Sequence, residues 1–302
     1  MKQQRRVRQA DIRLLRVFQT IVQAGGISAA ELVLNIGRST ISRHLSDLEL
    51  RLGVKLCERG PAGFSLTNEG QRVHEAASRL IASIENFAVE VSEIHDKLIG
   101  TLSIALFDMT LTNPAANMNT AFAHFDTIAP DVSLQIGIMS TDETERCILN
   151  GEVHVGVIPV HRKSASLDYY PLYSEDMFLY CGATHALLNS NHKAISPGQV
   201  RAARYAGLSY QSPNMLVSQR ERLNLKARVN DQEALAVLIL SGRYIGFLPN
   251  HFAEPYVQAN LMGRVRPDRY KYRSEFCAIV RRQPGPSRIA QKFLECLCNA
   301  HA

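Results

Sequence analysis

Residues 35–49 read NIGRSTISRHLSDLE. The first three residues predict a turn, because Asn and Gly tolerate backbone angles that other residues avoid. A helix should follow, since four apolar residues fall 4, 3 and 4 positions apart and share one face: Ile41, Leu45, Leu48 and Leu52. The opposite face is short, cationic and rich in hydroxyls, with Arg38, Ser39, Ser42, Arg43 and Ser46. The pattern predicts a helix that packs through its apolar face and presents its cationic face outward.

The residues on either side of this helix predict a small DNA-binding fold. Residues 11–23 place five apolar side chains on one helical stripe, which Gly25 and Gly26 end. Ser28, followed three residues later by Glu31, forms a capping box and predicts that a second helix starts at Ser28. Two short helices joined by a three-residue turn that contains Gly are typical of a helix-turn-helix. Residues 59–67, RGPAGFSLT, predict a hairpin, or wing, beside the helices.

Charge is distributed unevenly along the chain. Residues 1–67 hold eleven Lys and Arg against five Asp and Glu, whereas the rest of the chain holds equal numbers of both signs. This asymmetry predicts a module that binds a polyanion, joined to a neutral module. An outward-facing helix fits the major groove of double-stranded DNA, where Arg pairs with guanine and hydroxyls pair with either base type. The predicted DNA-binding residues are Arg38, Ser39, Thr40, Ser42, Arg43 and Arg59.

The composition limits which other classes of protein the chain can belong to. With 302 residues, 46% of them apolar and 21% charged, the chain is expected to form two or three globular domains. No run of about 18 apolar residues and no secretory signal occurs, so we expect a cytoplasmic protein without a membrane partner. The six cysteines form no C-x-x-C pair, which predicts reduced thiols, no metal site and no cofactor.

The stretch 10–70 resembles the N-terminal domain of LysR-type transcriptional regulators. The resemblance rests on the small pair Ala29-Ala30, S-T-I-S-R at 39–43, L-E-x-x-L-G at 48–53, E-R at 58–59 and L-T-x-x-G at 66–70. Cys57 stands where the family usually has Phe, and Gly37 where Ser often caps the recognition helix. The resemblance implies a winged helix-turn-helix that binds promoter DNA and a linker helix that dimerises the protein.

Residues 67–97 predict one long helix with an a/d heptad stripe. The stripe comprises Val73, Ala77, Leu80, Ile84, Phe87, Val91, Ile94 and Leu98. A strict 3.5-residue period favours packing of one helix on another, so we assign positions 73 to 94 of this stripe to dimerisation. A weaker row, Ile81 and Ala88, is expected to pack on the first helix of the DNA module. The predicted domains are therefore residues 1–67, the linker 68–98 and residues 99–302.

The last domain alternates strands and helices. Strands are expected at 101–106, 132–138 and 153–158, and a helix is expected to start at Pro114 with Asn113 as its cap. This alternation predicts an α/β domain with a parallel, doubly wound sheet, which binds ligands at the carboxyl ends of its strands. No G-x-S-x-G, H-E-x-x-H or P-loop motif occurs, so we predict that the protein is not an enzyme.

Four segments of this domain resemble the effector-binding domain of the same family: GTLSIAL, LNGEVHVGVI, PLYSEDMFLYCGATHAL and EALAVLILSGRYIGFLP. The resemblance implies two α/β lobes, as in periplasmic binding proteins, with chain crossings near 160–161 and 270–272. Lobe 1 would comprise 99–160 and 271–302, and lobe 2 would comprise 161–270. Carried over by position, the effector-binding residues are Thr110, Thr112, Thr141, Pro159, Val160, His161, Asn230 and Phe247.

The chemistry of this cleft leaves the effector open. Hydroxyls and free N–H groups at helix N-termini suit an anion. The loop FDMTLTN, however, is about two residues longer than the family's usual loop and adds Asp108, whose carboxylate would repel an anion. We therefore predict a homo-oligomeric DNA-binding regulator controlled by a small molecule. The alternative is a constitutive repressor whose α/β domain only oligomerises, and dimer and tetramer both remain open.

Overall fold

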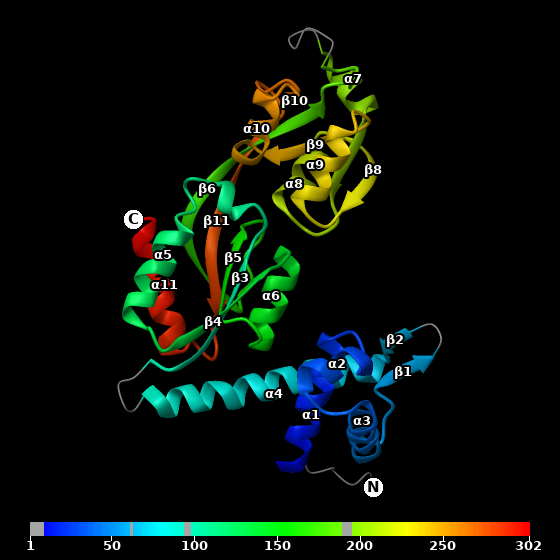
Figure 1. The fold of residues 1–302 in the computed structure, drawn as a ribbon. Helices are drawn as coiled ribbons and strands as arrows, with labels where there is room; N and C mark the ends of the chain where they lie inside the picture. The colour runs from blue at the N-terminus through cyan, green and yellow to red at the C-terminus, as the bar shows by residue number, and fades with distance from the viewer. Residues whose placement is uncertain (1–8, 61–62, 94–97, 189–194) are drawn as a thin grey trace. The chain divides into compact units, whose positions relative to one another are not determined.

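The computed structural model describes residues 9–60, 63–93, 98–188 and 195–302 (Figure 1). The chain divides into two compact units. The first comprises Met1–Val89 and Asn150–Glu152, and the second comprises Glu90–Leu149 and Val153–Ala302. The domain boundaries at 67 and 98 stay predictions, because the division between the units falls inside the long helix that joins them.

The first unit has the predicted order of helices and hairpin. Its elements are α1 (Gln9–Gln23), α2 (Ile27–Leu34), α3 (Arg38–Leu52), β1 (Cys57–Gly60), β2 (Gly63–Leu66) and α4 (Asn68–Glu93). Strands β1 and β2 pair antiparallel, from Cys57 opposite Leu66 to Gly60 opposite Gly63, and so form the predicted wing. The helices and the wing together make the winged helix-turn-helix.

The core of this unit is built from the apolar stripes that the sequence predicts. Five side chains of α1 and α3 are at most 1% exposed: Phe18, Ile21, Ile41, Leu45 and Leu48. Burying each such side chain stabilises the fold by roughly 1.5–3 kcal/mol, so the shared faces of α1 and α3 hold the module together. The turn before α3 is confirmed, since Asn35 adopts a left-handed conformation with φ of 51° and Gly37 precedes the first helical residue.

The capping box predicted at Ser28 is wrong. Helix α2 starts one residue earlier, at Ile27, and no side chain caps it. Its N-cap is Gly26, whose φ of 145° a residue with a side chain rarely adopts, and a Cβ there would lie 3.3 Å from the Phe64 Cβ atom. The carboxylate of Glu31 instead accepts a hydrogen bond from the Arg38 N–H at 3.1 Å, and so caps the start of α3. A tertiary contact has replaced the local one.

The residues of α4 that were predicted to form the dimerisation stripe fall into two groups, one in the core of the first unit and one outside it. Ala77 is 3% exposed within the first unit's own core, and Val73 packs against the same cluster. These two residues belong to that core, which corrects their assignment to a free helix face. Leu80 and Phe87 are exposed, at 37% and 66%, and Ile84 is half-buried. The side chain of Val91 and residue Ile94 lie outside what the structure describes.

Two residues of α4, Ile81 and Ala88, were predicted to pack on the DNA module, and Ile81 does so. Ile81 is buried in the core of the first unit, whereas the side chain of Ala88 is outside the description. No single helix of the described residues is long and apolar enough to cross a membrane. Helices α1 and α2 together have that length and composition, but they are bent by 117° and supply the core of the first unit.

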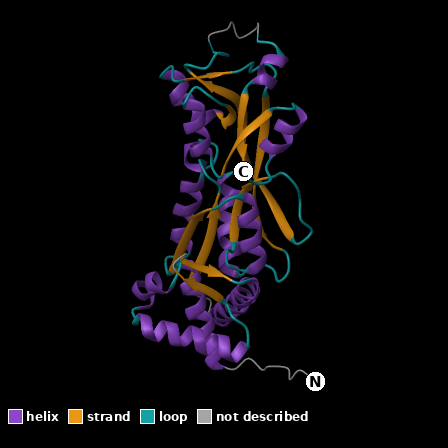
Figure 2. Cartoon of the chain, turned by 90° about the vertical axis from the view of Figure 1, so that its right-hand side faces the viewer, coloured by secondary structure: helices purple, strands orange, loops and turns teal. Residues whose placement is uncertain are grey.

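The second unit contains one mixed sheet with helices on either side (Figure 2). Its described strands are β3 (Gly100–Leu106), β4 (Val132–Ile138), β5 (Val155–Pro159), β6 (Leu167–Gly182), β7 (Arg204–Leu208), β8 (Asn224–Val229), β9 (Ile245–Pro249), β10 (Met262–Arg264) and β11 (Lys271–Arg281). Its helices are η1 (Thr110–Thr112), α5 (Met118–Ile128), α6 (Thr141–Asn150), α7 (Pro197–Ala202), α8 (Pro213–Arg220), α9 (Gln232–Leu240), α10 (Asn250–Gln258) and α11 (Arg288–Ala300).

The strand order is β4-β3-β5-β11-β6-β9-β7-β8, with β10 paired to β6. The predicted parallel pairing holds within each lobe, where β3 runs parallel to β4 and β5, and β7 runs parallel to β8 and β9. Strands β6 and β11 run antiparallel to each other through the middle of the sheet and are the two strands that cross between the lobes. In each lobe the first parallel strand lies between the other two, which is the doubly wound arrangement.

The first chain crossing lies later than predicted. After β5 the chain continues into β6, whose residues Leu167 to Tyr173 pair with the part of β11 that also pairs with β5. Only from Met177 does β6 pair with β9 of the other lobe. The crossing therefore falls near Ser174–Asp176 rather than at 160–161, because β6 is a single strand of 16 residues that serves both lobes. The second crossing, at Arg273–Glu275, lies close to the predicted 270–272.

The predicted helix start at Pro114 is also wrong. Residues 110–112 form a short 3-10 helix, and the Asn113 side chain accepts from the Ala115 N–H at 3.0 Å, which makes a turn rather than a helix cap. Helix α5 begins at Met118, after Asn117. The loop that follows β3 is therefore longer than the sequence pattern suggests.

Candidate DNA interface and effector cavity

Helix α3 presents a polar face of the predicted kind. Arg38, Ser39 and Arg43 are exposed, and Thr40 and Ser42 are half-buried. The apolar residues of the same helix are buried in the module, so the cationic side chains face away from it. The Arg59 side chain lies outside the described residues. The contacts of these six residues with DNA remain a prediction.

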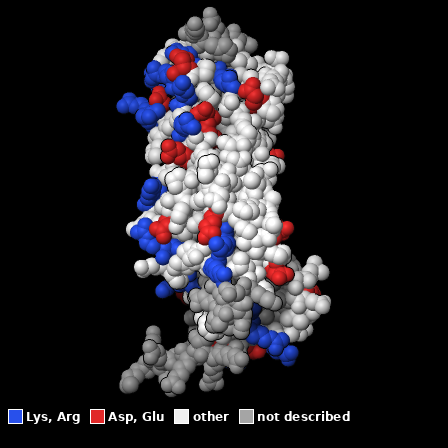
Figure 3. Space-filling view, turned by 90° about the vertical axis from the view of Figure 1, so that its left-hand side faces the viewer, with Lys and Arg blue, Asp and Glu red and all other residues white. Residues whose placement is uncertain are grey.

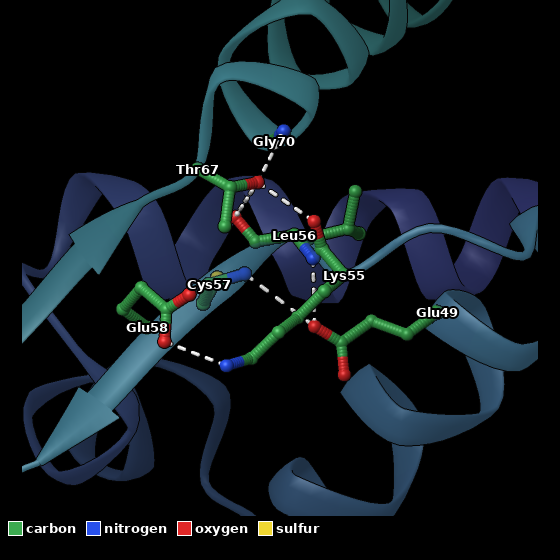
Figure 4. Close-up of polar contacts among 7 residues, drawn as sticks. All are labelled: Glu49, Lys55, Leu56, Cys57, Glu58, Thr67 and Gly70. Atoms are coloured by element: carbon green, nitrogen blue, oxygen red, sulfur yellow. Dashed lines mark hydrogen bonds and ion pairs between the residues drawn. The ribbon is translucent and has the colours of Figure 1, made fainter.

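A carboxylate fixes the wing to the C-terminal end of α3 (Figure 4). The Oε1 atom of Glu49 accepts hydrogen bonds from the backbone N–H groups of Leu56 at 2.8 Å and Cys57 at 3.4 Å. Leu56 and Cys57 are buried, at 0% and 1% exposed, so water cannot replace Glu49 as their acceptor. Glu49 thus helps to fix the orientation of the wing relative to α3.

A threonine ties the same segment to α4. The Thr67 hydroxyl accepts from the Gly70 N–H at 2.8 Å, which caps α4, and it donates toward the Lys55 carbonyl at 2.7 Å (Figure 4). A Cβ at position 70 would overlap the carbonyl oxygen of Leu56, so only Gly allows the helix to approach this closely. The L-T-x-x-G motif of the sequence therefore has a structural explanation.

The second unit contains a cavity of about 390 Å³ at the ends of its parallel strands. Residues that follow four strands line it in pairs: Phe107 and Asp108 after β3, Met139 and Ser140 after β4, Ser209 and Tyr210 after β7, and Asn230 and Asp231 after β8, with Ile138 and Glu143 completing the wall. Carboxyl ends of parallel strands at a change of winding direction are the usual ligand site of such sheets. The two lobes present these ends to the same cavity, and its volume is that of a small-molecule site.

Hydrogen bonds join the two lobes beside the cavity. The Gln232 N–H of lobe 2 donates to the Asp108 Oδ2 atom of lobe 1 at 2.6 Å, and the Gln211 N–H donates to the Asp142 Oδ2 atom at 3.4 Å. The Thr112 hydroxyl lies 2.9 Å from the His251 Nδ1 atom. These contacts hold the lobes together around the cavity.

The cavity has an acidic wall. The pKa of Asp108 is raised to about 6, mainly by burial; the Gln232 N–H acts to lower it, and the neighbouring Asp231 and Glu175 carboxylates act to raise it. Burial also raises the pKa of Tyr210, with added contributions from Asp108 and Asp231. At mildly acidic pH, below its pKa, Asp108 is therefore mostly protonated.

Two of the predicted effector-binding residues lie at or beside this cavity. Asn230 lines it, and its Oδ1 atom accepts from the Ser209 hydroxyl at 2.6 Å. Thr141 lies between the lining residues Ser140 and Glu143 and is 0% exposed, and its hydroxyl has no partner among the described residues. The assignment of both residues to an effector remains a prediction.

Thr110 and Thr112 use their hydroxyls within the protein. Thr110 donates to the Phe107 carbonyl at 2.6 Å and is 7% exposed, whereas Thr112 is exposed and donates to the Met109 carbonyl at 3.0 Å. Neither residue lines the cavity, because the longer loop folds back on itself through these bonds.

The residues predicted at the crossings are mostly structural. Phe247 is 0% exposed in the core of lobe 2, edge to face with Tyr272 at 5.3 Å, and its assignment to the effector stays a prediction. Pro159 ends β5 opposite Phe276, and the Val160 N–H donates to the Glu275 carbonyl at 2.8 Å. The two nitrogens of His161 are buried and lack a partner among the described atoms. None of these four residues lines the cavity.

Five of the cavity-lining residues that the sequence did not predict share one feature. Phe107, Ser140, Ser209, Tyr210 and Asp231 all stand within two residues of a strand end. Strand ends were predictable for β3 and β4 from their alternation, but β7 and β8 gave no comparable pattern. The part of the chain that the structure describes contains no group of three His, Cys, Asp or Glu side chains placed to hold a metal ion.

Charges over the second unit are mixed. On the face in Figure 3, Lys and Arg side chains are interspersed with Asp and Glu rather than gathered in one patch. This distribution matches the balanced composition of the chain after residue 67. The excess of Lys and Arg that supports binding to DNA therefore lies in residues 1–67.

Comparisons with known proteins agree with these two units. Residues 12–71 match the family model of the bacterial regulatory helix-turn-helix protein, lysR family, and residues 95–301 match the LysR substrate binding domain. The HTH-type transcriptional activator BauR of Pseudomonas aeruginosa is 39% identical over 285 residues, which cover 94% of this chain and 93% of BauR. The chain belongs to the LysR family of transcriptional regulators.

Solved structures share the fold. CbnR, a LysR family transcriptional regulator, superposes with a TM-score of 0.64 at 20% identity and covers 96% of this chain and 99% of its own. Full-length CbnR in complex with its target DNA gives a TM-score of 0.62. The Vibrio cholerae virulence activator AphB gives 0.56 at 16% identity, with 96% and 99% coverage. The protein is thus a DNA-binding transcriptional regulator with an effector-binding domain.

Proposed function

We propose that a small molecule controls this regulator by occupying the cavity between the two lobes. The observation that carries the proposal is the convergence of four strand ends on that cavity, with hydrogen bonds that join the lobes beside it. A ligand that contacts both lobes changes the free energy of every contact between them, and so favours one arrangement of the lobes. The matched substrate-binding domain favours this function over a constitutive repressor.

DNA binding is assigned to α3 of two copies of the chain. Arg38 and Ser39 would reach base edges from the first turn, and Arg43 would contact a phosphate or a base one turn later. The two copies would pair through the part of α4 that the core leaves uncovered, Leu80, Ile84 and Phe87. A helix face with large exposed apolar residues supports such pairing.

We assign no chemical step to the protein, so the effector would be bound and released unchanged. The regulator would act in the cytoplasm, where its DNA target lies. Because the relative named BauR is an activator, we further propose that this chain activates transcription.

A thermal-shift screen of small metabolites on the full chain tests the proposed function. A ligand that binds only the folded protein, at about 100 times its dissociation constant, stabilises it by about 2.7 kcal/mol and raises the melting temperature by a few degrees. Footprints on the promoter with and without that ligand should then differ. Footprints that respond to no binding metabolite would support the constitutive alternative.

A further inference from the structure

We propose, on the basis of the proposed function, that the effector carries a protonated amine and that Asp108 is the carboxylate that binds it. The cavity wall carries three acidic side chains, Asp108, Glu143 and Asp231, and none of its lining residues is Lys, Arg or His. An anionic ligand would meet repulsion from these carboxylates; Glu143 is paired with Arg146 at 4.0 Å, but Arg146 does not line the cavity. A cationic group meets attraction from the carboxylates.

Three carboxyl or amide oxygens in or beside the cavity wall are unpaired acceptors within the described part of the chain, and the Thr141 hydroxyl beside the cavity is unpaired there as well. Asp108 uses Oδ2 to accept from Gln232, while its Oδ1 atom is buried and has no partner among the described residues. Gln232 is 3% exposed, and its Oε1 atom is also without a partner there. Asp142, beside the lining residue Glu143, has the same deficit at Oδ1.

These acceptors indicate what a ligand must supply. A buried acceptor without a donor costs about 1–3 kcal/mol, so native proteins rarely keep several in one place without a use. A primary ammonium group brings three N–H donors and one positive charge. It would therefore satisfy the unpaired Oδ1 atom of Asp108 in the cavity wall, whereas a carboxylate would bring only further acceptors.

The rest of the wall fits a small organic cation better than a metal ion. The rings of Phe107 and Tyr210 meet edge to face at 6.1 Å beside Asp108, and they offer an apolar and aromatic surface to the body of a ligand. The acidic residues are not placed as a group of metal ligands within the described residues. Ser140, Ser209 and Asn230 supply neutral polar contacts for the remainder of the molecule.

The pKa of Asp108 gives the binding a pH dependence. In the empty site it is about 6, raised mainly by burial and also by Asp231 and Glu175. A primary aliphatic amine is protonated throughout pH 5 to 8, so Asp108 is the group that changes. Affinity for the amine should rise by about tenfold from pH 5 to pH 7, as Asp108 ionises, and then level off.

Matched ligand sets on the full chain test the proposal. For skeletons of three to six carbons, the probes are the 1-amine, the ω-amino acid, the carboxylate and the 1-alcohol, each ranked by thermal shift and then titrated by calorimetry at pH 7.5. We expect binding only from probes that carry an amine. Asp108→Asn removes a charge-assisted hydrogen bond and should weaken the best probe about 10-fold to 100-fold.

Two further variants make this result specific to the site. Glu143 is exposed, so Glu143→Gln should fold normally and weaken the same probe only about twofold to fivefold. Asp126, exposed on α5 and not part of the cavity wall, gives the matched control Asp126→Asn, which should bind like wild type. The ligand-free melting temperature of each variant reports whether it folds.

The possible results separate this proposal from the proposed function. Binding of carboxylates or alcohols without amines would overturn the amine assignment, yet would keep a ligand-controlled regulator. Equal amine affinity in Asp108→Asn and Asp126→Asn would place the amine elsewhere and overturn the role of Asp108. A shift caused by Mg²⁺ or Ca²⁺ alone, with none from any amine, would also overturn the proposal.

Discussion

Removal of the Glu49 carboxylate should loosen the wing of the DNA module. The Leu56 N–H bond at 2.8 Å is a full charge-assisted hydrogen bond, whereas the Cys57 bond at 3.4 Å is long and weak. Since Glu49 is half-exposed, we take about 1.5 kcal/mol for the first bond and about 0.5 kcal/mol for the second. Glu49→Ala should therefore cost the wing about 2 kcal/mol of local stability.

Hydrogen exchange followed by mass spectrometry measures this loss directly on the full chain. A cost of about 2 kcal/mol corresponds to roughly 30-fold faster exchange of the amides in peptides that cover residues 53–60. Glu58→Ala is the matched control, because Glu58 pairs with Lys55 at 2.6 Å but both side chains are 61% exposed. An exposed pair contributes about 0–1 kcal/mol. Equal exchange rates in the two variants would refute the role given to Glu49.

Three other variants test the DNA module and α4. Gly70→Ala should lower the melting temperature of the protein by several degrees, because the new Cβ overlaps the Leu56 carbonyl and forces α4 away from the wing; an unchanged temperature would contradict the packing. Leu80→Lys combined with Phe87→Lys should yield a smaller species in sedimentation and weaker operator binding, and an unchanged folded oligomer would exclude this helix face from the interface. Arg43→Ala should weaken DNA binding by about 1–3 kcal/mol in a mobility-shift titration and, where Arg43 contacts phosphate, reduce the salt dependence by about one unit; wild-type affinity would refute its assignment.

The DNA module could be predicted because its signals are local. The spacing of Ile41, Leu45 and Leu48 sets the buried face of α3, and Asn35 sets the turn before it. The capping box failed because the choice between two uses of Glu31 is made by the neighbouring helix, which no short motif records. Local patterns predict elements well, but they do not show which tertiary partner a side chain finds.

The effector unit was predictable in outline and not in its site. Alternation predicted β3 and β4, whereas the first crossing was placed before β6, because the sequence does not show that one continuous strand serves both lobes. Phe247 was assigned to the cleft by its position in the family resemblance, but its side chain is buried in the core of lobe 2, which an apolar run buried on both faces does not reveal. Asp108 was noticed as an added charge, and only the structure shows its unpaired oxygen.

The energetics of Asp108 connect stability with ligand control. A carboxyl whose pKa is raised by folding destabilises the fold once it ionises, and the cost grows as pH rises from about 4 through 6. A folded value near 6 against an ordinary value of 3.8 corresponds to about 3 kcal/mol at neutral pH. A bound ammonium lowers that pKa and removes most of the cost, so the free energy is recovered only in the complex. The ionised Asp108 destabilises the domain, and a bound ammonium group removes most of this cost. The charge therefore increases the free-energy difference between the free and bound states, which is the quantity that a ligand-controlled regulator needs.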